Sequence, residues 1–397
     1  MRRREQRFPV TVPPVTERGA ADDNGTPGPL PWRVAMDRAL YGPDGFFVAG
    51  AGPAAHFRTT AHATGVLTAC VLRLLAELDS ALGHPPVLSV VDVGAGRGEL
   101  LRGILGAVGP SCSSEPAAAV GVPLADRVRL VAVERAPRPD DLPPEIDWLP
   151  DLPDRITGLL ITTEWLDNVP LDLAAHTDDG WRYLLVDPTT GTESLGPPVN
   201  PLDQAWLDHW WPAPPPNSSI REFGSAEAAE SDANSLINAI GGRAEIGRRR
   251  DEEWARAVGR VERGLAVAVD YGHLRDSRPL GGTLTGYRGG RQVAAVPDGS
   301  CDVTAHVAMD SVASAGERVA RCAYSLVFQR EALRALGADG RRPPITMAGR
   351  DPAGYVRALA AASTVGELTD PAGLGGHRWL LQPVGIGALP VMARWRA

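Results

Sequence analysis

The chain has 397 residues and a formal net charge of −8 at pH 7, and 44% of its residues are hydrophobic and 22% charged. This ordinary globular composition allows one large α/β domain with additions or two domains, and the acidic balance argues against a nucleic-acid binder that relies on bulk charge. The four cysteines show no metal-ligand spacing, so we expect reduced thiols and no metal site.

The basic residues and the apolar segments indicate a compartment. All 40 basic residues are arginine, and alanine, glycine and proline are abundant, which is typical of a GC-rich bacterial gene. The Pro-rich stretch after the first arginines lacks the apolar core of a signal peptide. The most apolar helical stretch, residues 65–82, is interrupted by Arg73, Glu77 and Asp79. We therefore expect a cytoplasmic bacterial protein with no membrane partner and no nucleic-acid partner.

The N-terminal part of the chain is expected to begin with a disordered segment and to continue with helices. Residues 1–29 are polar and rich in Pro, Gly and Asp, and they predict a disordered arm. From residue 30 the pattern becomes helical, with a Gly-Pro-Asp-Gly turn at residues 42–45. Apolar residues at helical spacing then predict a long amphipathic helix over residues 63–82.

A glycine-rich turn follows the first strong strand signal. The β-branched run of residues 87–93 carries Asp92 near its end, and helical spacing resumes at residue 99. Between them stand three glycines at alternate positions, Gly94, Gly96 and Gly98. A strand, a tight turn and a helix in this order form the ligand site of open α/β sheets, where glycines let the backbone approach the ligand.

The acidic surroundings of this turn select among ligands. The dinucleotide fingerprint requires a small residue at the position of Glu99, whose carboxylate would repel a pyrophosphate. A P-loop needs a lysine, and the chain has none. S-adenosyl-L-methionine has no phosphate and a positive sulfonium, so we predict it as the cofactor, with S-adenosyl-L-homocysteine as its product. A purely structural glycine turn is the alternative.

Two further stretches supply candidate cofactor contacts. Residues 127–134 predict the second parallel strand, which ends at Glu134, where a carboxylate accepts both ribose hydroxyls. The alternative for Glu134 is an exposed acid at a strand end. Asp147 and Trp148 are expected after the third strand or in its loop, where they offer an acceptor and a flat face for adenine, unless Trp148 is plain core.

An acidic pair follows the next strand. Residues 156–164 predict a buried strand, and Glu164 and Asp167 point into the same crevice if the chain turns helical there. Such a pair orients a nucleophile by charge-assisted hydrogen bonds and suits a guanidinium. The alternative is an acid pair at a helix N-terminus, favoured by the macrodipole. Further along, His306 is a candidate base or carries a structural hydrogen bond.

The second half of the chain predicts an insertion and the rest of the sheet. A Pro-rich and Ser-rich segment that starts at residue 187 surrounds Trp206, Trp210 and Trp211, and is expected to be disordered around residues 213–235. A fourth buried strand is predicted at 264–272. Alternating strands and helices predict a mostly parallel, doubly wound α/β sheet. A helix is also predicted over 250–263, and a closing strand pair near 378–382 and 389–395.

The predicted division of the chain has five parts. They are a disordered arm (1–29), an N-terminal helical cap segment (30–86), the first part of the cofactor-binding core (87–186), a Pro- and Trp-rich insertion (187–249), and the second part of the core with substrate-side additions (250–397).

Seven stretches, in the same order and spanning about residues 30 to 382, resemble the MidA-type class I methyltransferases. This family includes the mitochondrial protein arginine methyltransferase needed for assembly of respiratory complex I. The stretches are Ala39–Phe47, the glycine turn, Glu164–Pro170, Asp270–Gly272, Gly282–Leu284, Asp302–Val307 and Gln329–Gly337.

The resemblance implies a Rossmann-like, doubly wound and mostly parallel seven-stranded sheet with an N-terminal helical segment and a mid-chain insertion. It implies that Glu164 and Asp167 lie on the active-site loop, and that the cofactor positions are Asp92, Gly94, Gly96, Gly98 and Glu134. Two acids of the family's N-terminal motif are replaced by His56 and His62, and the family's asparagine before the loop glutamate is Thr163.

Together these features predict an S-adenosyl-L-methionine-dependent methyltransferase that acts by direct displacement on a protein substrate. An arginine guanidinium is one candidate acceptor, and an amine or amide nucleophile is another. One alternative is a small-molecule O- or N-methyltransferase in which the Trp-rich insertion forms a lid. The other is a non-catalytic assembly factor that binds the cofactor without turnover. A homodimer is a further hypothesis.

Overall fold

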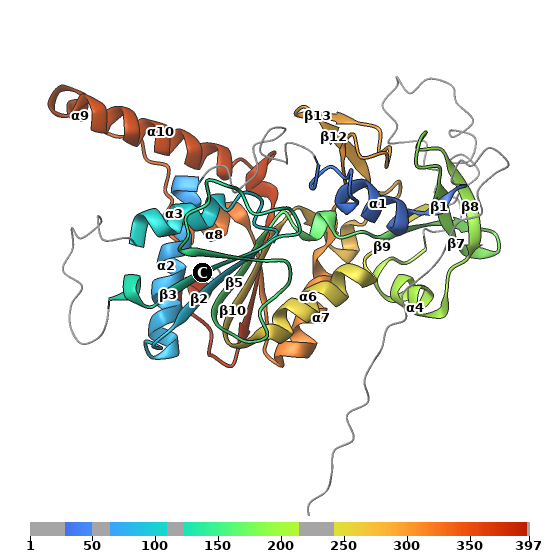
Figure 1. Cartoon of the computed structure of the whole chain (residues 1–397), viewed down its shortest axis with the longest axis horizontal. Helices are drawn as coiled ribbons and strands as arrows, with labels where there is room; N and C mark the ends of the chain where they lie inside the picture. The colour runs from blue at the N-terminus through green and yellow to red at the C-terminus, as the bar shows by residue number, and fades with distance from the viewer. Residues whose placement is uncertain (1–27, 50–63, 109–122, 214–241, 395–397) are drawn as a thin grey trace, which may run out of the picture.

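The computed structural model describes residues 28–49, 64–108, 123–213 and 242–394 (Figure 1). Three of the predicted features fall outside these ranges. They are most of the N-terminal arm, most of the stretch at 213–235, and the segment that carries His56 and His62.

A seven-stranded sheet is the largest sheet of the described chain, with the strand order β16, β17, β10, β5, β2, β3, β4. The strands from β10 to β4 are parallel, whereas β16 and β17 pair antiparallel at one edge. This confirms the predicted mostly parallel sheet. The strands are β2 (Leu88–Val93), β3 (Val128–Val133), β4 (Ile146–Leu149), β5 (Ile156–Thr163), β10 (Val261–Asp270), β16 (Ser325–Phe328) and β17 (Arg378–Val384).

Helices cover both faces of this sheet, which is why its central strands are continuous apolar runs. Alternate residues of β2 enter two separate cores, so that Val90 packs with one set of helices and Val91 with the other. The helix predicted over 63–82 is confirmed as α2. One face carries α2 (Thr64–Leu82), α3 (Glu99–Val108), α8 (Gln329–Ala335) and α10 (Pro352–Leu368), and the other carries α6 (Arg248–Arg260) and α7 (Met309–Ala320) (Figure 1).

A second, five-stranded antiparallel sheet lies beside the first (Figure 1). Helix α1 (Trp32–Tyr41) packs on one face and α4 (Pro201–Trp210) on the other. Trp206 of α4 and Trp211, which directly follows it, are buried against this sheet, so these two tryptophans of the predicted insertion are part of a core and not of a lid. The strands are β1 (Leu30–Pro31), β6 (Asp172–Thr177), β7 (Gly180–Val186), β8 (Glu193–Pro198) and β9 (Gly242–Ile246).

The predicted closing strand pair is half correct. Strand β17 forms as expected, but the second member is the helix α11 (Pro390–Arg394). Because β17 already pairs with β10 on one side and β16 on the other, it offers no free edge to a further strand. The remaining short elements are β11 (Gly272–His273), β12 (Thr285–Arg288), β13 (Arg291–Val293), β14 (Asp302–Thr304), β15 (Val307–Ala308) and α9 (Ile345–Arg350).

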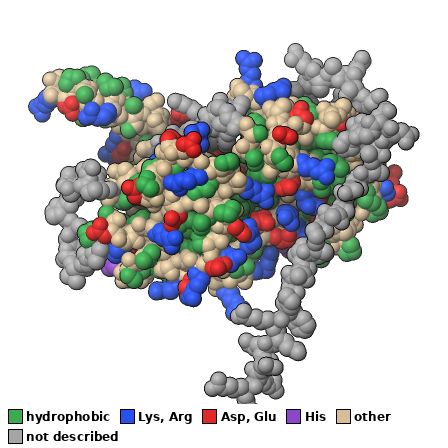
Figure 2. Space-filling model, viewed as in Figure 1, with side chains coloured by type: hydrophobic (Ala, Val, Ile, Leu, Met, Phe, Trp, Pro, Cys, Tyr) green, Lys and Arg blue, Asp and Glu red, His purple; other side chains and the backbone are tan. Residues whose placement is uncertain are grey.

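Helices α9 and α10 form an arm that projects from the body (Figure 1). Ile345 is 74% and Val356 is 64% exposed on this arm. Figure 2 shows hydrophobic side chains along it together with arginine and acidic ones, as on the rest of that face.

Two glycines at the centre of the large sheet have no room for a side chain. Gly158 of β5 and Gly264 of β10 face each other and have φ of +141° and +152°. A Cβ on Gly158 would lie 2.1 Å from the carbonyl oxygen of Ser89, and one on Gly264 would lie 1.9 Å from that of Gly158. Only glycine therefore lets the strands that carry the site approach this closely.

We expect Gly158→Ala to lower the free energy of unfolding by on the order of 3 kcal/mol, because both the backbone angle and the neighbouring strand oppose a Cβ. Urea denaturation measures this change. Gly259→Ala on the exposed side of α6 is the matched control, since its Cβ meets only Val319 at 3.6 Å, and we expect it to stabilise by about 0.5–1 kcal/mol. Equal stability of Gly158→Ala and wild type would contradict this account.

Candidate active site

A cavity of about 1230 Å³ opens at the carboxyl ends of the parallel strands. Its wall includes the glycine turn after β2, the end of β3, the loop after β5 and the residues that follow β10. Helices α1 and α6 and residues near 302–306 and 372–377 also line it. Open α/β sheets bind their ligands at this edge.

The glycine turn adopts a backbone that other residues resist. Gly94, Gly96 and Gly98 have φ of +71°, +59° and +79°, in the left-handed region. A Cβ would lie 3.0 Å from Trp165 Cδ1 at Gly94 and 2.8 Å from Leu142 Cδ1 at Gly98. Gly94 and Gly96 line the cavity, whereas Gly98 is not among the lining residues.

Glu134, directly after β3, lies against this turn. Its Oε2 accepts the Gly96 N–H at 3.1 Å, and its Oε1 accepts the N–H groups of Arg135 and Ala136 at 2.7 and 3.1 Å. Burial raises the pKa of Glu134, and these three N–H groups oppose the rise. A carboxylate has about four acceptor positions, so Glu134 retains capacity for a ribose hydroxyl.

The carboxyls around the turn fit a cationic cofactor. Asp92 Oδ1 is buried and has no hydrogen-bond partner within the described ranges. Burial, together with the charges of Glu99 and Glu134, raises the pKa of Asp92 to about 8. A positive ligand would relieve this repulsion and a pyrophosphate would add to it. The residues present therefore fit S-adenosyl-L-methionine and not a dinucleotide.

Asp147 and Trp148 lie elsewhere. Both belong to β4, the edge strand beyond β3, and neither is among the residues that line the cavity. The Asp147 carboxylate pairs with Arg129 at 2.8 Å, and the Trp148 indole N–H donates to the Ala136 carbonyl at 3.1 Å. We expected them after the third strand or in its loop, but residues 146–149 form a parallel strand of the sheet.

Glu164, directly after β5, stands in strained backbone. Its φ is +51°, which is uncommon for a residue other than glycine and costs about 1–3 kcal/mol. Its N–H donates to the Val269 carbonyl at 2.8 Å, which ties the loop to β10. Its Oε1 lies 3.9 Å from His377 Nδ1. Strain held by the surrounding fold is typical of active-site residues.

Asp167 is held by the fold and has one carboxylate oxygen unpaired. It lies in the short 3₁₀ turn η4 (Leu166–Asn168) and is 3% exposed. Oδ2 accepts the Tyr271 hydroxyl and the Thr304 hydroxyl, the latter at 2.7 Å. Oδ1 is buried without a hydrogen-bond partner in the described part of the chain. Burial raises the pKa of Asp167.

Two more buried acids adjoin this pair. Asp270 at the end of β10 accepts the backbone N–H of Leu166 at 3.0 Å and so fixes η4. Asp302 accepts the Asn168 side-chain amide at 2.7 Å. Burial and the nearby Asp167 raise the pKa of Asp270 well above its usual range and that of Asp302 to about 8. The cavity therefore concentrates carboxyls that resist ionisation.

Two histidines face these acids. The His306 ring lies 5.1 Å from the Tyr271 ring, and the His377 ring lies 5.4 Å from it. Removal from water lowers the pKa of His306, and it lowers that of His377 to about 4, so both imidazoles are neutral at pH 7. His377 was missed by the sequence reasoning because it precedes β17, whose antiparallel pairing with β10 brings a distant segment to this edge.

The raised carboxyl pKa values predict how stability depends on pH. Asp92 and Asp302 titrate near pH 8 in the folded protein and near pH 4 in the unfolded chain, where aspartate has a pKa of about 3.9. The folded state binds more protons between these limits, so the free energy of unfolding falls as pH rises through the window. Urea denaturation at about pH 5.5 and about pH 7.5 should show the higher midpoint at the lower pH, with a smaller difference in Asp302→Asn. A wild-type midpoint that rises over this interval would contradict the prediction.

Two further searches cover the described ranges. They contain no group of three or more His, Cys, Asp or Glu side chains arranged to hold a metal ion. Within the same ranges, none of the helices combines the length and the apolar character needed for a membrane crossing.

Comparison with known proteins identifies the family. Residues 70–326 match the model of a family described as "Putative S-adenosyl-L-methionine-dependent methyltransferase". The chain belongs to this family. The match covers more than half of the chain and includes the glycine turn, Glu134 and the Glu164–Asp167 loop, and it confirms the predicted methyltransferase and its cofactor, S-adenosyl-L-methionine.

Solved structures share the fold of this methyltransferase. A COG1565 superfamily member from Burkholderia thailandensis, bound to S-adenosyl-homocysteine, has 22% sequence identity and a TM-score of 0.67, over 92% of this chain and 91% of that one. A native structure of a COG1565 superfamily protein from the same organism has 22% identity and a TM-score of 0.66 over the same shares. No curated protein matches.

Proposed function

We propose that this methyltransferase transfers the methyl group of S-adenosyl-L-methionine to a cationic side chain of a protein substrate, with an arginine guanidinium as the acceptor. The observation that carries the proposal is the carboxylate cluster of Glu164, Asp167 and Asp302, which lines the same cavity as the glycine turn. In particular, the buried Asp167 Oδ1 has no partner among the described residues.

Electrostatics favours a cation at this cluster. Burial raises the pKa values of Asp167, Asp270 and Asp302, and the charge of Asp167 raises those of Asp270 and Asp302 further. A guanidinium would favour the ionised carboxylates, and its planar donors match carboxylate oxygens. A neutral substrate would leave these carboxyls protonated, and an anionic substrate would oppose their ionisation.

Each part of the site has a proposed role. On the cofactor side, Glu134 accepts ribose hydroxyls, while Gly94, Gly96 and Gly98 shape the turn and Asp92 faces the cation. The bound cofactor supplies a methyl group that already sits on a positive sulfonium. Glu164 and Asp167 align the acceptor nitrogen for an in-line displacement, in which positioning is the main requirement.

Neutral His306 is proposed to receive the proton that the acceptor nitrogen releases. A new N–C bond forms as the C–S bond breaks, S-adenosyl-L-homocysteine leaves, and the nitrogen's proton passes to the imidazole. His306 lines the cavity beside Tyr271, and its lowered pKa keeps it able to accept a proton at pH 7.

Two alternative functions are less well supported. A small-molecule methyltransferase in which the Trp-rich insertion forms a lid is disfavoured, because no tryptophan of α4 lines the cavity. A non-catalytic assembly factor would not need an ordered acidic loop, but here Tyr271, Thr304 and Asp270 all bond to Asp167.

The test is transfer of labelled methyl groups from S-adenosyl-L-methionine to a lysate of cells that lack the gene. We expect label in protein, retained after removal of small molecules. Label only in the small-molecule fraction would support the first alternative. Binding of S-adenosyl-L-homocysteine with no label in either fraction would support the second.

A further inference from the structure

Two buried charged residues support the loops that carry Asp167 and His306. Arg250 hydrogen-bonds to both loops, and Glu245 reaches the His306 loop through Thr283. Arg250 lies in the first turn of α6 and is 1% exposed, and Glu245 lies in β9 and is 2% exposed. Neither is among the residues that line the cavity. Strand β9 belongs to the second sheet, and α6 packs on the large sheet, so neither residue lies on a cofactor-binding strand.

Arg250 bonds only to backbone carbonyls of the two loops. Its Nη2 donates to the Asp167 carbonyl, and its Nε donates to that of Val169 at 3.1 Å. Its Nη1 donates to the carbonyls of Ala305 and His306 at 2.9 and 3.0 Å. One rigid guanidinium therefore joins the Asp167 loop to the His306 loop.

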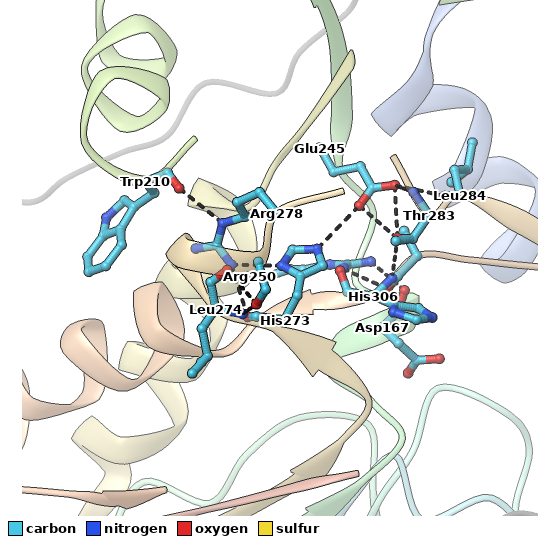
Figure 3. A network of polar contacts seen from close by, with 12 residues as sticks. Asp167, Trp210, Glu245, Arg250, His273, Leu274, Arg278, Thr283, Leu284 and His306 are labelled. Carbon is cyan, nitrogen blue, oxygen red and sulfur yellow. Dashed lines mark hydrogen bonds and ion pairs between the residues drawn. The ribbon is translucent and has the colours of Figure 1, made fainter. Parts of the chain in front are cut away.

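Glu245 fixes the other side of the His306 backbone through Thr283. The Thr283 hydroxyl donates to Glu245 at 2.8 Å and accepts the His306 N–H at 2.8 Å (Figure 3). Glu245 also accepts the backbone N–H groups of Thr283 and Leu284, the latter at 2.7 Å. The N–H and the carbonyl of His306 are thus both tied to buried charged groups.

His273 and Arg278 lie next to the Glu245 carboxylate, on the side away from Thr283 (Figure 3). Arg278 donates to His273 Nδ1 at 2.7 Å, so the ring proton of a neutral His273 is on Nε2. His273 Nε2 faces Glu245 Oε2 at 3.9 Å (Figure 3). Arg278 in turn pairs with Asp310 and donates to the Trp210 carbonyl at 3.0 Å.

We propose that Arg250 and Glu245 are positioning residues of the methyltransferase, which set the separation of Asp167 and His306 by clamping their backbones. The inference rests on the proposed function for the roles of those two residues. Its test, however, measures the pKa of His306 and hydrogen exchange in the two loops, and not methyl transfer. Its failure therefore differs from a failure of the substrate assignment.

The two charges also act on the His306 imidazole in opposite directions. Arg250 lowers its pKa, whereas Glu245 raises it. The other groups that act on or lie against the ring are Asp167, which raises the pKa, His273, which lowers it, and the rings of Tyr271 and His377. Loss of Arg250 and loss of Glu245 should therefore shift the His306 pKa in opposite directions, whereas a general loss of packing would shift it in the same direction in both variants.

The experiment uses the full chain and three substitutions, Arg250→Gln, Glu245→Gln and Thr283→Val. The pKa of His306 is measured by NMR titration of labelled histidine, assigned with His306→Asn. We expect the pKa to move up in Arg250→Gln and down in Glu245→Gln. Shifts in the same direction, or no shift in either variant, would overturn the proposal.

Hydrogen exchange supplies the positional measurement. In Arg250→Gln we expect peptides covering residues 163–170 and 303–308 to exchange about tenfold faster, as loss of a charge-assisted hydrogen bond implies. In Glu245→Gln and Thr283→Val we expect this acceleration in residues 303–308. Peptides covering the glycine turn should be unchanged. Unchanged exchange in both loops would also overturn the proposal.

The controls separate positioning from folding. Arg248→Gln removes the neighbouring arginine, which pairs with Asp203 and Glu252 and does not line the cavity, so we expect His306 and both loops to behave as in the wild type. If Arg250→Gln does not fold, Arg250→Lys keeps the charge without the planar fork, and exchange in the two loops should still accelerate. Thr283→Val removes a single hydroxyl and tests the same clamp at His306 alone.

Discussion

We expect Asp167→Asn to lower the rate of methyl transfer roughly 100-fold, because the acceptor loses the charge that is proposed to align it. The amide can still accept from Tyr271 and Thr304 through its oxygen, which places the NH₂ group where Oδ1 stands. A donor at that position repels a cationic acceptor instead of receiving its hydrogen bond. Initial rates with labelled S-adenosyl-L-methionine measure the loss.

The same variant should bind S-adenosyl-L-homocysteine with unchanged affinity, because Glu134 and the glycine turn are intact. Asp208→Asn is the matched control, since Asp208 is exposed on α4 and bonds only to Gln204. We expect it to transfer methyl groups at the wild-type rate. Wild-type transfer by Asp167→Asn would refute the role given to this carboxylate.

Loss of the Glu134 carboxylate should weaken binding of S-adenosyl-L-homocysteine about 100-fold. Charge-assisted hydrogen bonds are worth about 1.5–3 kcal/mol each. Glu134 accepts the Gly96 N–H and is the residue proposed to accept the ribose hydroxyls. Gly96→Val should have a comparable effect, because valine resists a φ of +59°. Calorimetry measures the affinity for S-adenosyl-L-homocysteine of Glu134→Ala, of Gly96→Val and of the double variant.

The control for this prediction lies at the amino ends of the strands, opposite the carboxyl ends that border the cavity. Glu262 is at the start of β10 and pairs with Arg155, so Glu262→Ala should leave binding unchanged. Glu134→Gln, which keeps an acceptor without the charge, should lie between wild type and alanine. Wild-type affinity in the double variant would contradict the cofactor site.

The turn could be predicted from the sequence because its determinants are local. An apolar strand, glycines at alternate positions and the acid at Glu99 define both its backbone and its preference for a cation within a dozen residues. The parallel strands were likewise marked by continuous apolar runs. The loop that carries Glu164 and Asp167 was found for the same reason, since it follows such a run directly.

What could not be predicted depends on contacts between distant segments. His377 reaches the site through antiparallel pairing of β17, and Arg250 reaches it from a helix that reads as an exposed charged segment. Asp147 and Trp148 were misplaced because β4 has only 4 residues and Asp147 interrupts its apolar run, so the stretch lacks the signal of a buried strand. No sequence pattern next to Asp302 indicates that its side chain is buried.

The most direct test of the account is the chemical identity of the methylated product. Protein labelled by the wild-type enzyme is hydrolysed to amino acids and the labelled species is identified by mass spectrometry. We expect methylarginine, formed by the wild type and at roughly one hundredth of that level by Asp167→Asn. Label on an oxygen or in a small molecule, or equal labelling by the two proteins, would contradict it.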